Sequence, residues 1–138
     1  MNIFIISCGK AKVNKKTSAY KLYSGGFFKK QLSLVRSMGA TKKNTFILSA
    51  KYGLIPCEEI IAPYDLKMGS KGCVDYNFVN NQALKLNIKN AKIISTAGSA
   101  YRIILKKIFS ECKFPLEGIG GMGLQIKEMN RLIGKNRC

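Results

Sequence analysis

The fold that the sequence predicts is decided by the stretch Thr45-Phe46-Ile47-Leu48-Ser49-Ala50-Lys51-Tyr52-Gly53-Leu54-Ile55-Pro56, followed by Pro63-Tyr64-Asp65. Its apolar start, residues 45–48, is typical of a buried strand that ends in a small polar turn. Ligands of open α/β sheets bind just past the carboxyl ends of the strands. The loop after this strand carries a lysine, two tyrosines and an aspartate in that position. We therefore expect the rest of the protein to be organised around it.

Two further apolar runs, Asn2 to Ser7 and Ala91 to Thr96, predict buried strands on either side of this stretch in the chain. Helical spacing of apolar residues over 18–38 predicts a helix that begins at Gly25-Gly26 and ends at Gly39. The first strand, this helix and the strand at residues 45–48 then form a β-α-β unit, which should be a right-handed crossover.

Helical spacing returns three times in the second half of the chain. It covers residues 74–88, with a possible interruption near residues 80–81, then residues 100–112, and a last helix after the glycine loop 118–123. Residues 114–116 form a possible short strand. The order predicts one α/β domain over residues 1–138, a three-layer fold with a mainly parallel sheet of three to four strands.

The most unusual feature of the composition is its large excess of basic over acidic residues. The 138 residues include 24 Lys and Arg against 7 Asp and Glu, a formal net charge of +17. Such an excess costs folding energy through self-repulsion, and a polyanionic partner is a common reason to carry it. The alternative is a lysine-rich proteome, although that bias should also raise the glutamate content. We therefore predict DNA, another nucleic acid or a nucleotide as the partner.

Several classes of protein fit the sequence poorly. No apolar run approaches the ~20 residues that span a bilayer, and the N-terminus lacks the basic start of a signal peptide. The chain has no histidine, and its five cysteines, Cys8, Cys57, Cys73, Cys112 and Cys138, never form a C-x-x-C pair. We expect a cytoplasmic protein with reduced thiols and with neither a metal site nor a cofactor. The sequence leaves the oligomeric state open.

Without histidine, acid–base or nucleophilic chemistry must come from other side chains. Asp65 is the best catalytic candidate, with Lys51 and Tyr52 as partners. Glu58 and Glu59 are the alternative catalytic carboxylates. Each also has a plain structural interpretation: a turn aspartate, a surface lysine, and a tyrosine at the edge of the core.

A second group of candidates would bind substrate. The turn Ser7-Cys8-Gly9-Lys10 follows the first strand, where a glycine lets backbone approach an anion and a lysine supplies charge. It could equally be a plain strand exit. Cys8 lacks an evident partner base. The predicted substrate-binding residues are Ser7, Cys8, Gly9, Lys10, Tyr23, Ser49, Tyr64, Gly98 and Tyr101.

Three short islands resemble a known group of proteins. Ser49-Ala50-Lys51-Tyr52-Gly53-Leu54-Ile55-Pro56, Pro63-Tyr64-Asp65-Leu66 and Ser7-Cys8-Gly9-Lys10 resemble small, mostly uncharacterised bacterial and phage proteins. That group is distantly similar to the YaaA family of peroxide-stress proteins, which carry Leu-Ser-Gly-x-Tyr-Gly-x-Leu-x-Pro and Pro-Tyr-x-Leu-x-Met-Gly. The counterpart here runs from Leu48 to Gly69, and the pair Gly98 and Tyr101 also resembles the small-protein group. The YaaA resemblance implies DNA binding and a role in limiting oxidative DNA damage.

Three hypotheses follow. The first is an enzyme acting on nucleic acid or nucleotides by hydrolysis of an N-glycosidic bond: Lys10 and Lys51 hold phosphate, Tyr52 and Tyr64 position the base or sugar, and Asp65 activates water. A carboxylate suits the positive charge that develops on the sugar in such a reaction. The second is a non-catalytic DNA-binding stress or phage accessory protein of the YaaA type. The third is a protein-interaction module.

Overall fold

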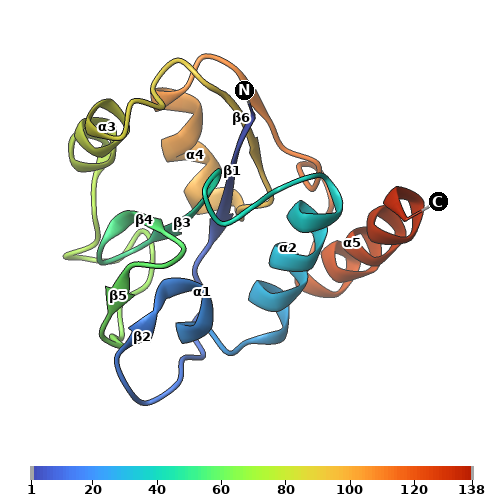
Figure 1. The fold of residues 1–138 in the computed structure, drawn as a ribbon, viewed down its shortest axis with the longest axis horizontal. Helices are drawn as coiled ribbons and strands as arrows, with labels where there is room; N and C mark the ends of the chain where they lie inside the picture. The colour runs from blue at the N-terminus through green and yellow to red at the C-terminus, as the bar shows by residue number, and fades with distance from the viewer. Residues whose placement is uncertain (1, 138) are drawn as a thin grey trace.

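The computed structural model describes residues 2–137, and the sheet at its centre has five strands (Figure 1). They are β1 (Asn2–Ser7), β3 (Thr45–Ser49), β4 (Gly53–Pro56), β6 (Lys92–Ser95) and β7 (Cys112–Lys113), in the order β4-β3-β1-β6-β7. All neighbours are parallel except β3 and β4. This confirms the predicted α/β class and the mainly parallel sheet.

The number of strands differs from the predicted three to four. Gly53 takes φ +72°, a left-handed conformation that turns the chain straight back on itself, so that residues 53–56 pair antiparallel with β3. The sequence placed these residues in a loop. The fifth strand, β7, pairs with β6 at Cys112–Lys113 rather than at residues 114–116, because the chain is already extended at Phe109, the C-cap of α4.

Five helices and a two-stranded ribbon surround the sheet. The ribbon pairs β2 (Thr17–Ser18) with β5 (Ile60–Ile61). The helices are α1 (Ala19–Leu22), α2 (Gly26–Ser37), α3 (Tyr76–Lys85), α4 (Ser99–Ile108) and α5 (Met122–Asn136). The start of α2 agrees with the prediction, and Gly39 follows its end at φ +99°. Helix α3 runs without interruption through residues 80–81, and α4 ends four residues before the predicted boundary at residue 112.

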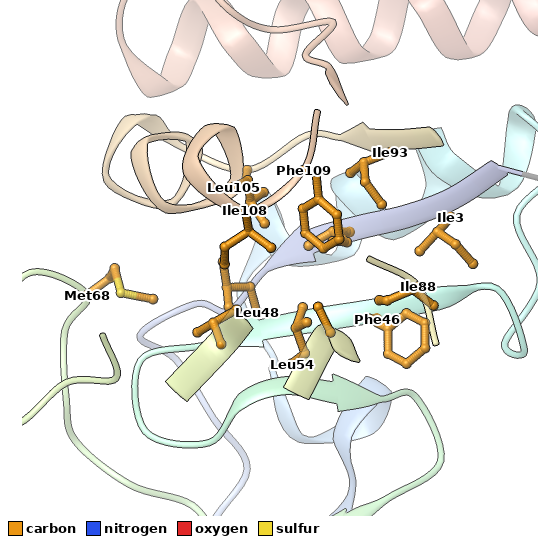
Figure 2. Close-up of a cluster of buried hydrophobic side chains, with 14 of the residues drawn as sticks. Ile3, Phe46, Leu48, Leu54, Met68, Ile88, Ile93, Leu105, Ile108 and Phe109 are labelled. Atoms are coloured by element: carbon orange, nitrogen blue, oxygen red, sulfur yellow. The ribbon is translucent and has the colours of Figure 1, made fainter. Parts of the chain in front are cut away.

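Helices cover both faces of the sheet. On one face, side chains of β1, β3, β4 and β6 pack with Val79 and Ala83 of α3 and with Leu105 and Ile108 of α4 (Figure 2). On the other face, Phe4 and Ile6 alternate toward α1 and α2. Alternate side chains of β1 therefore belong to two different cores, as expected for a strand that is buried on both faces.

Helix α5 packs outside this arrangement, against α2 (Figure 1). Leu34 of α2 is fully buried between Met129 and Ile133 of α5 and Leu116. Leu124, in the first turn of α5, is 59% exposed and does not join this cluster, which is formed by later residues of the helix.

Candidate functional site

A cavity of about 790 Å³ lies at the carboxyl edge of the sheet. Its volume is within the range of small-molecule sites. It brings together seven of the residues predicted for the site: Ser7, Cys8, Gly9, Lys10, Asp65, Gly98 and Tyr101. The segment of residues 65–67 therefore faces the exit of β1, and the two stretches that the sequence singled out form parts of one site.

Three helices begin at this cavity, and none of them is capped by a side chain. Gly25 precedes α2, Gly98 precedes α4 and Gly121 precedes α5, and no acidic residue lies in the first turn of any of the three. By contrast α3, which does not reach the cavity, is capped by Asp75, whose carboxylate accepts from the N–H of Phe78 at 2.9 Å. The first N–H groups of a helix have no intrahelical acceptor and attract anions. The cavity wall therefore favours a negatively charged ligand.

The floor of the cavity is fixed by one buried amide, Gln31 of α2. Its Oε1 accepts from the N–H of Ser7 at 3.0 Å and from Oγ1 of Thr96 at 2.8 Å, while its Nε2 donates to the carbonyl of Ser7 at 3.1 Å. All three residues are at most 4% exposed. The ends of β1 and β6 are thus tied to α2 directly beneath the cavity.

Cys8 and Tyr101 form the side of the cavity next to this floor. The thiol of Cys8 lies 3.1 Å from the hydroxyl of Tyr101. Burial raises the pKa of Tyr101 well above its ordinary range, and the neighbouring Cys8 adds to the shift. Tyr101 therefore remains a neutral hydroxyl at physiological pH, able to donate a hydrogen bond but not to act as a base.

A chain of three hydroxyls lies beside the cavity. Tyr64 stands in its middle, 2.7 Å from the hydroxyl of Tyr23 and 2.7 Å from Oγ of Ser49. Burial, together with nearby Cys8, raises the pKa of both tyrosines. Tyr23 and Ser49 are buried, so these two predicted binding residues act here by holding Tyr64.

The structure places Lys51 and Tyr52 outside the cavity lining. Both lie in the turn between β3 and β4, where Tyr52 packs edge-on against Tyr64 with ring centroids 5.4 Å apart. The Nζ of Lys51 lies 5.3 Å from the ring of Tyr52. Neither residue is among those that line the cavity. Of the predicted catalytic set, only Asp65 lines the cavity.

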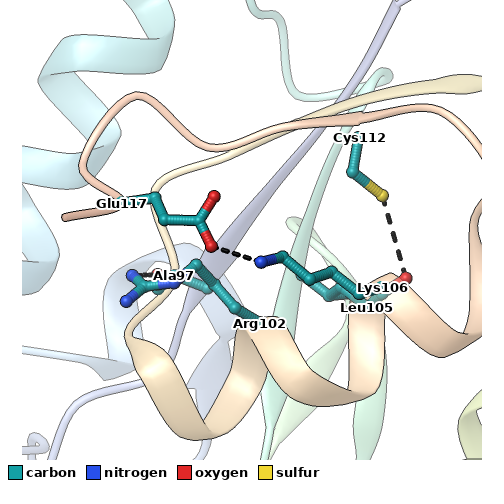
Figure 3. Close-up of polar contacts among 6 residues, drawn as sticks. All are labelled: Ala97, Arg102, Leu105, Lys106, Cys112 and Glu117. Carbon is teal, nitrogen blue, oxygen red and sulfur yellow. Dashed lines mark hydrogen bonds and ion pairs between the residues drawn. The ribbon is translucent and has the colours of Figure 1, made fainter.

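Most of the other carboxylates already have partners. Glu58, Glu111, Glu117 and Glu128 form ion pairs with basic side chains, and Figure 3 shows Glu117 against Lys106 of α4. Asp75 caps α3, and Glu59 is exposed on the turn before β5. Asp65 pairs with no side chain of the described residues. A carboxylate without a side-chain partner, in a cavity that three lysines also line, could act on water or on developing positive charge.

Sequence reasoning missed several residues that shape the site. They are Lys12, Lys67, Phe27, Phe28, Met122 and Gln125, which line the cavity, and Gln31 beneath it. Gln31 carried a usable signal, since a polar residue there interrupts the apolar face of a helix that starts beside a predicted site. Lys12 carried none among so many lysines.

The chain belongs to the family of unknown function DUF6884, whose family model matches residues 3–131. This agrees with the resemblance to small uncharacterised proteins; the resemblance to YaaA stays a prediction. No curated protein matches the chain.

The matched range covers the cavity and reaches into α5. Within residues 2–137, no helix is long and apolar enough to cross a membrane. Cys138 lies outside the described residues; of the other four cysteines, Cys57 is buried and Cys8, Cys73 and Cys112 are half-buried free thiols.

Proposed function

We propose that this protein binds a nucleotide in the cavity, either free or at an exposed position of a nucleic acid, and hydrolyses its N-glycosidic bond. The observation that carries the proposal is the position of Asp65, a carboxylate without a side-chain partner in a cavity whose lining also includes three lysines and the starts of three helices.

The wall of the cavity supports a phosphate-bearing ligand. Lys10, Lys12 and Lys67 line it, and three uncapped helix ends face it. Phosphate groups are the anions for which such a combination is best suited. The overall charge of +17 would also draw a polyanion toward the site.

Aromatic side chains support a base next to that phosphate. Phe27 and Tyr101, both half-buried, line the same cavity, whereas Phe28 is buried behind it. Aromatic rings stack on the faces of unpaired bases, and an enzyme acting on a base in nucleic acid must take it out of the stack.

Asp65 would then act as general base on water. The water oxygen forms a bond to C1′ of the sugar, its proton passes to the Asp65 carboxylate, and the C1′–N bond breaks. The leaving base takes a proton from solvent, so the products are the free base and a sugar with a 1′-hydroxyl. The negative charge of the carboxylate also stabilises positive charge on the sugar in the transition state.

The test is release of free base, measured by chromatography after incubation with nucleotides, single-stranded and double-stranded oligonucleotides. We expect release by the wild type, a loss of about 100-fold or more in Asp65→Asn, and unchanged binding. Glu59→Gln, an exposed carboxylate outside the cavity, is the matched control and should retain the activity. Release by Asp65→Asn at the wild-type rate, or no release by the wild type from any substrate, refutes the proposal.

The charge of the chain also favours a second candidate, a non-catalytic DNA-binding accessory protein of the YaaA type. Most of the 24 basic residues lie outside the four ion pairs, so an extended basic surface is available. Binding of oligonucleotides across a salt series should then give a steep negative log–log slope. A flat response excludes this candidate.

A further inference from the structure

Resting on the proposed nucleotide-binding function, we propose that Lys12 is the residue that binds the phosphate of the ligand. Sequence analysis assigned this role to Lys10 and Lys51. The structure assigns it to a different lysine, because Lys12 lines the cavity and its ammonium is held in place.

The backbone on both sides of Lys12 is pinned to the segment that leads into α2. Lys12 forms an antiparallel bridge with Tyr23. The N–H of Val13 donates to the carbonyl of Leu22 at 2.8 Å, and the N–H of Ser24 donates to the carbonyl of Ala11 at 3.0 Å. Lys12 is therefore fixed next to the start of α2, in a loop that the sequence left without structure.

The side chain of Lys12 is held as well. Its Nζ donates to the carbonyl of Lys10 at 3.0 Å and lies 4.3 Å from the ring centroid of Tyr64 and 5.7 Å from that of Tyr23. The hydrogen bond between the two tyrosines fixes both rings. A lysine ammonium loses considerable rotamer freedom when it binds, and a lysine that is already ordered avoids most of that cost.

The held ammonium still has capacity for a ligand. An ammonium carries three donors, of which the carbonyl of Lys10 takes one. No carboxylate of the described residues pairs with Lys12. The uncapped start of α2 lies alongside, since a Cβ on its N-cap, Gly25, would stand 3.7 Å from Cβ of Ala11. Two N–H donors and a helix N-terminus side by side match the several oxygens of one phosphate.

The other lysines are less suited to this role. Lys10 and Lys67 also line the cavity, but both are exposed, and Lys10 contributes only a backbone carbonyl to the contacts of Lys12. Lys51 lies over Tyr52, outside the cavity lining. We therefore expect Lys10 to add general attraction, and Lys12 to discriminate a phosphorylated ligand from its unphosphorylated form.

The experiment compares the four ribonucleoside 5′-monophosphates with the corresponding nucleosides, and inorganic phosphate as a separate probe, by titration at low salt. The readout is the dissociation constant of the nucleoside divided by that of its monophosphate. This ratio measures the contribution of the phosphate to binding. A charge-assisted site should give a ratio of about tenfold or more in the wild type. Lys12→Met should bring the ratio close to one, and Lys12→Arg should restore part of it. Lys16→Met removes the same charge from the same loop outside the cavity and should leave the ratio unchanged.

Two further variants test how Lys12 is held. Tyr64→Phe keeps the ring beneath the ammonium, whereas Tyr64→Leu removes it, so only the second should lower the ratio substantially. Circular dichroism and thermal unfolding confirm that each variant is folded before it is titrated.

Three results overturn the inference: no binding of phosphate or of any monophosphate to the wild type, an equal loss in Lys12→Met and Lys16→Met, or a full ratio in folded Lys12→Met. If the ratio depends on Lys12 while no base is ever released, the inference stands and the hydrolytic function fails. If base is released with no dependence on Lys12, the function stands and this inference fails.

Discussion

The hydroxyl oxygens of Tyr23 and Tyr64 lie 2.7 Å apart, and this contact extends a hydrogen-bond chain that begins at Ser49. Oγ of Ser49 accepts from the N–H groups of Lys51 and Tyr52, each at 3.1 Å, which uses both of its lone pairs. Ser49 therefore donates its proton to Tyr64, whose hydroxyl also lies within hydrogen-bond distance of the hydroxyl of Tyr23. The turn after β3 thus sets the orientation of a hydroxyl beside the cavity.

Tyr64→Phe should lower the free energy of unfolding by about 1–3 kcal/mol, because Ser49 and Tyr23 both lose a buried partner. Tyr23→Phe should cost less, and the double variant should cost less than the sum of the two. Urea unfolding measures all three, with the half-exposed Tyr76→Phe as a control that changes little. Strict additivity would show that the two hydroxyls do not interact.

Gly53 and Gln82 protect the outer edge of β4. The side chain of Gln82 accepts from the N–H of Leu54 at 2.8 Å and donates to the carbonyl of Tyr52 at 2.9 Å, which replaces a neighbouring strand. A Cβ at Gly53 would stand 2.1 Å from Oε1 of Gln82, at a φ of +72°. Gly53→Ala should therefore displace Gln82 and cost about 2–4 kcal/mol through backbone strain and lost hydrogen bonds.

The matched comparison for this edge is Gln82→Ala alone and together with Gly53→Ala. Gln82→Ala should cost about 1–3 kcal/mol. In the Gln82→Ala background, Gly53→Ala should lower the free energy of unfolding only by the backbone strain, about 1–2 kcal/mol. Full additivity in chemical denaturation would mean that the two residues do not meet.

Gln31→Leu should be among the most destabilising single changes in the cavity floor. It keeps the volume but leaves the N–H and carbonyl of Ser7 buried without partners, at a cost of about 2–5 kcal/mol. Thr96→Val removes one bond of the same cluster and should cost about 1 kcal/mol. Equal stability of Gln31→Leu and the wild type in urea would contradict this account of the floor.

Alkaline pH should destabilise the protein partly through Cys57. Burial raises the pKa of its thiol from 9.0 to about 11. The unfolded thiol releases its proton from about pH 9, while the folded thiol keeps it. Stability from this group is therefore complete below about pH 9 and is lost as the pH rises to about 11. Urea midpoints measured from pH 8 to 11 should fall more gently in Cys57→Ala than in the wild type. The raised pKa values of Tyr23, Tyr64 and Tyr101 act in the same direction at higher pH. An identical slope in Cys57→Ala would refute the assignment.

The main elements of the fold could be predicted from the sequence because they have strong periodicity. The apolar runs gave β1 and β3 close to their observed bounds, and Gly25 and Gly39 marked the limits of α2. The short pairings could not be predicted. Residues 53–56 are too few to show alternation, and their pairing depends on the left-handed turn at Gly53 and on Gln82, 29 residues further along.

The candidate site, like the fold, could be predicted from the sequence only in part. The turn Ser7–Lys10 after β1 and the segment that carries Asp65 do meet at one cavity, although Asp65 follows β5 and not β3 directly. The prediction placed Lys51 and Tyr52 there as well, but they lie in the turn between β3 and β4 and outside the cavity lining, and the sequence does not show that residues 53–56 form a strand. Lys12 could not be distinguished, because its role depends on contacts with Tyr23 and Tyr64, which lie 11 and 52 residues away in the chain.

The amide of Gln31 joins Ser7, the last residue of β1, to Thr96, which follows β6 and lies 89 residues further along the chain. The floor of the cavity therefore exists only once β1, α2 and β6 are all assembled, and no partly folded piece can contain it. In hydrogen-exchange terms, the amide of Ser7 should open only with the global unfolding of the molecule, whereas amides of the lysine loop at residues 14–16 should exchange through local fluctuations. The protein would thus offer a ligand a floor as durable as the whole fold beneath a rim that can adapt.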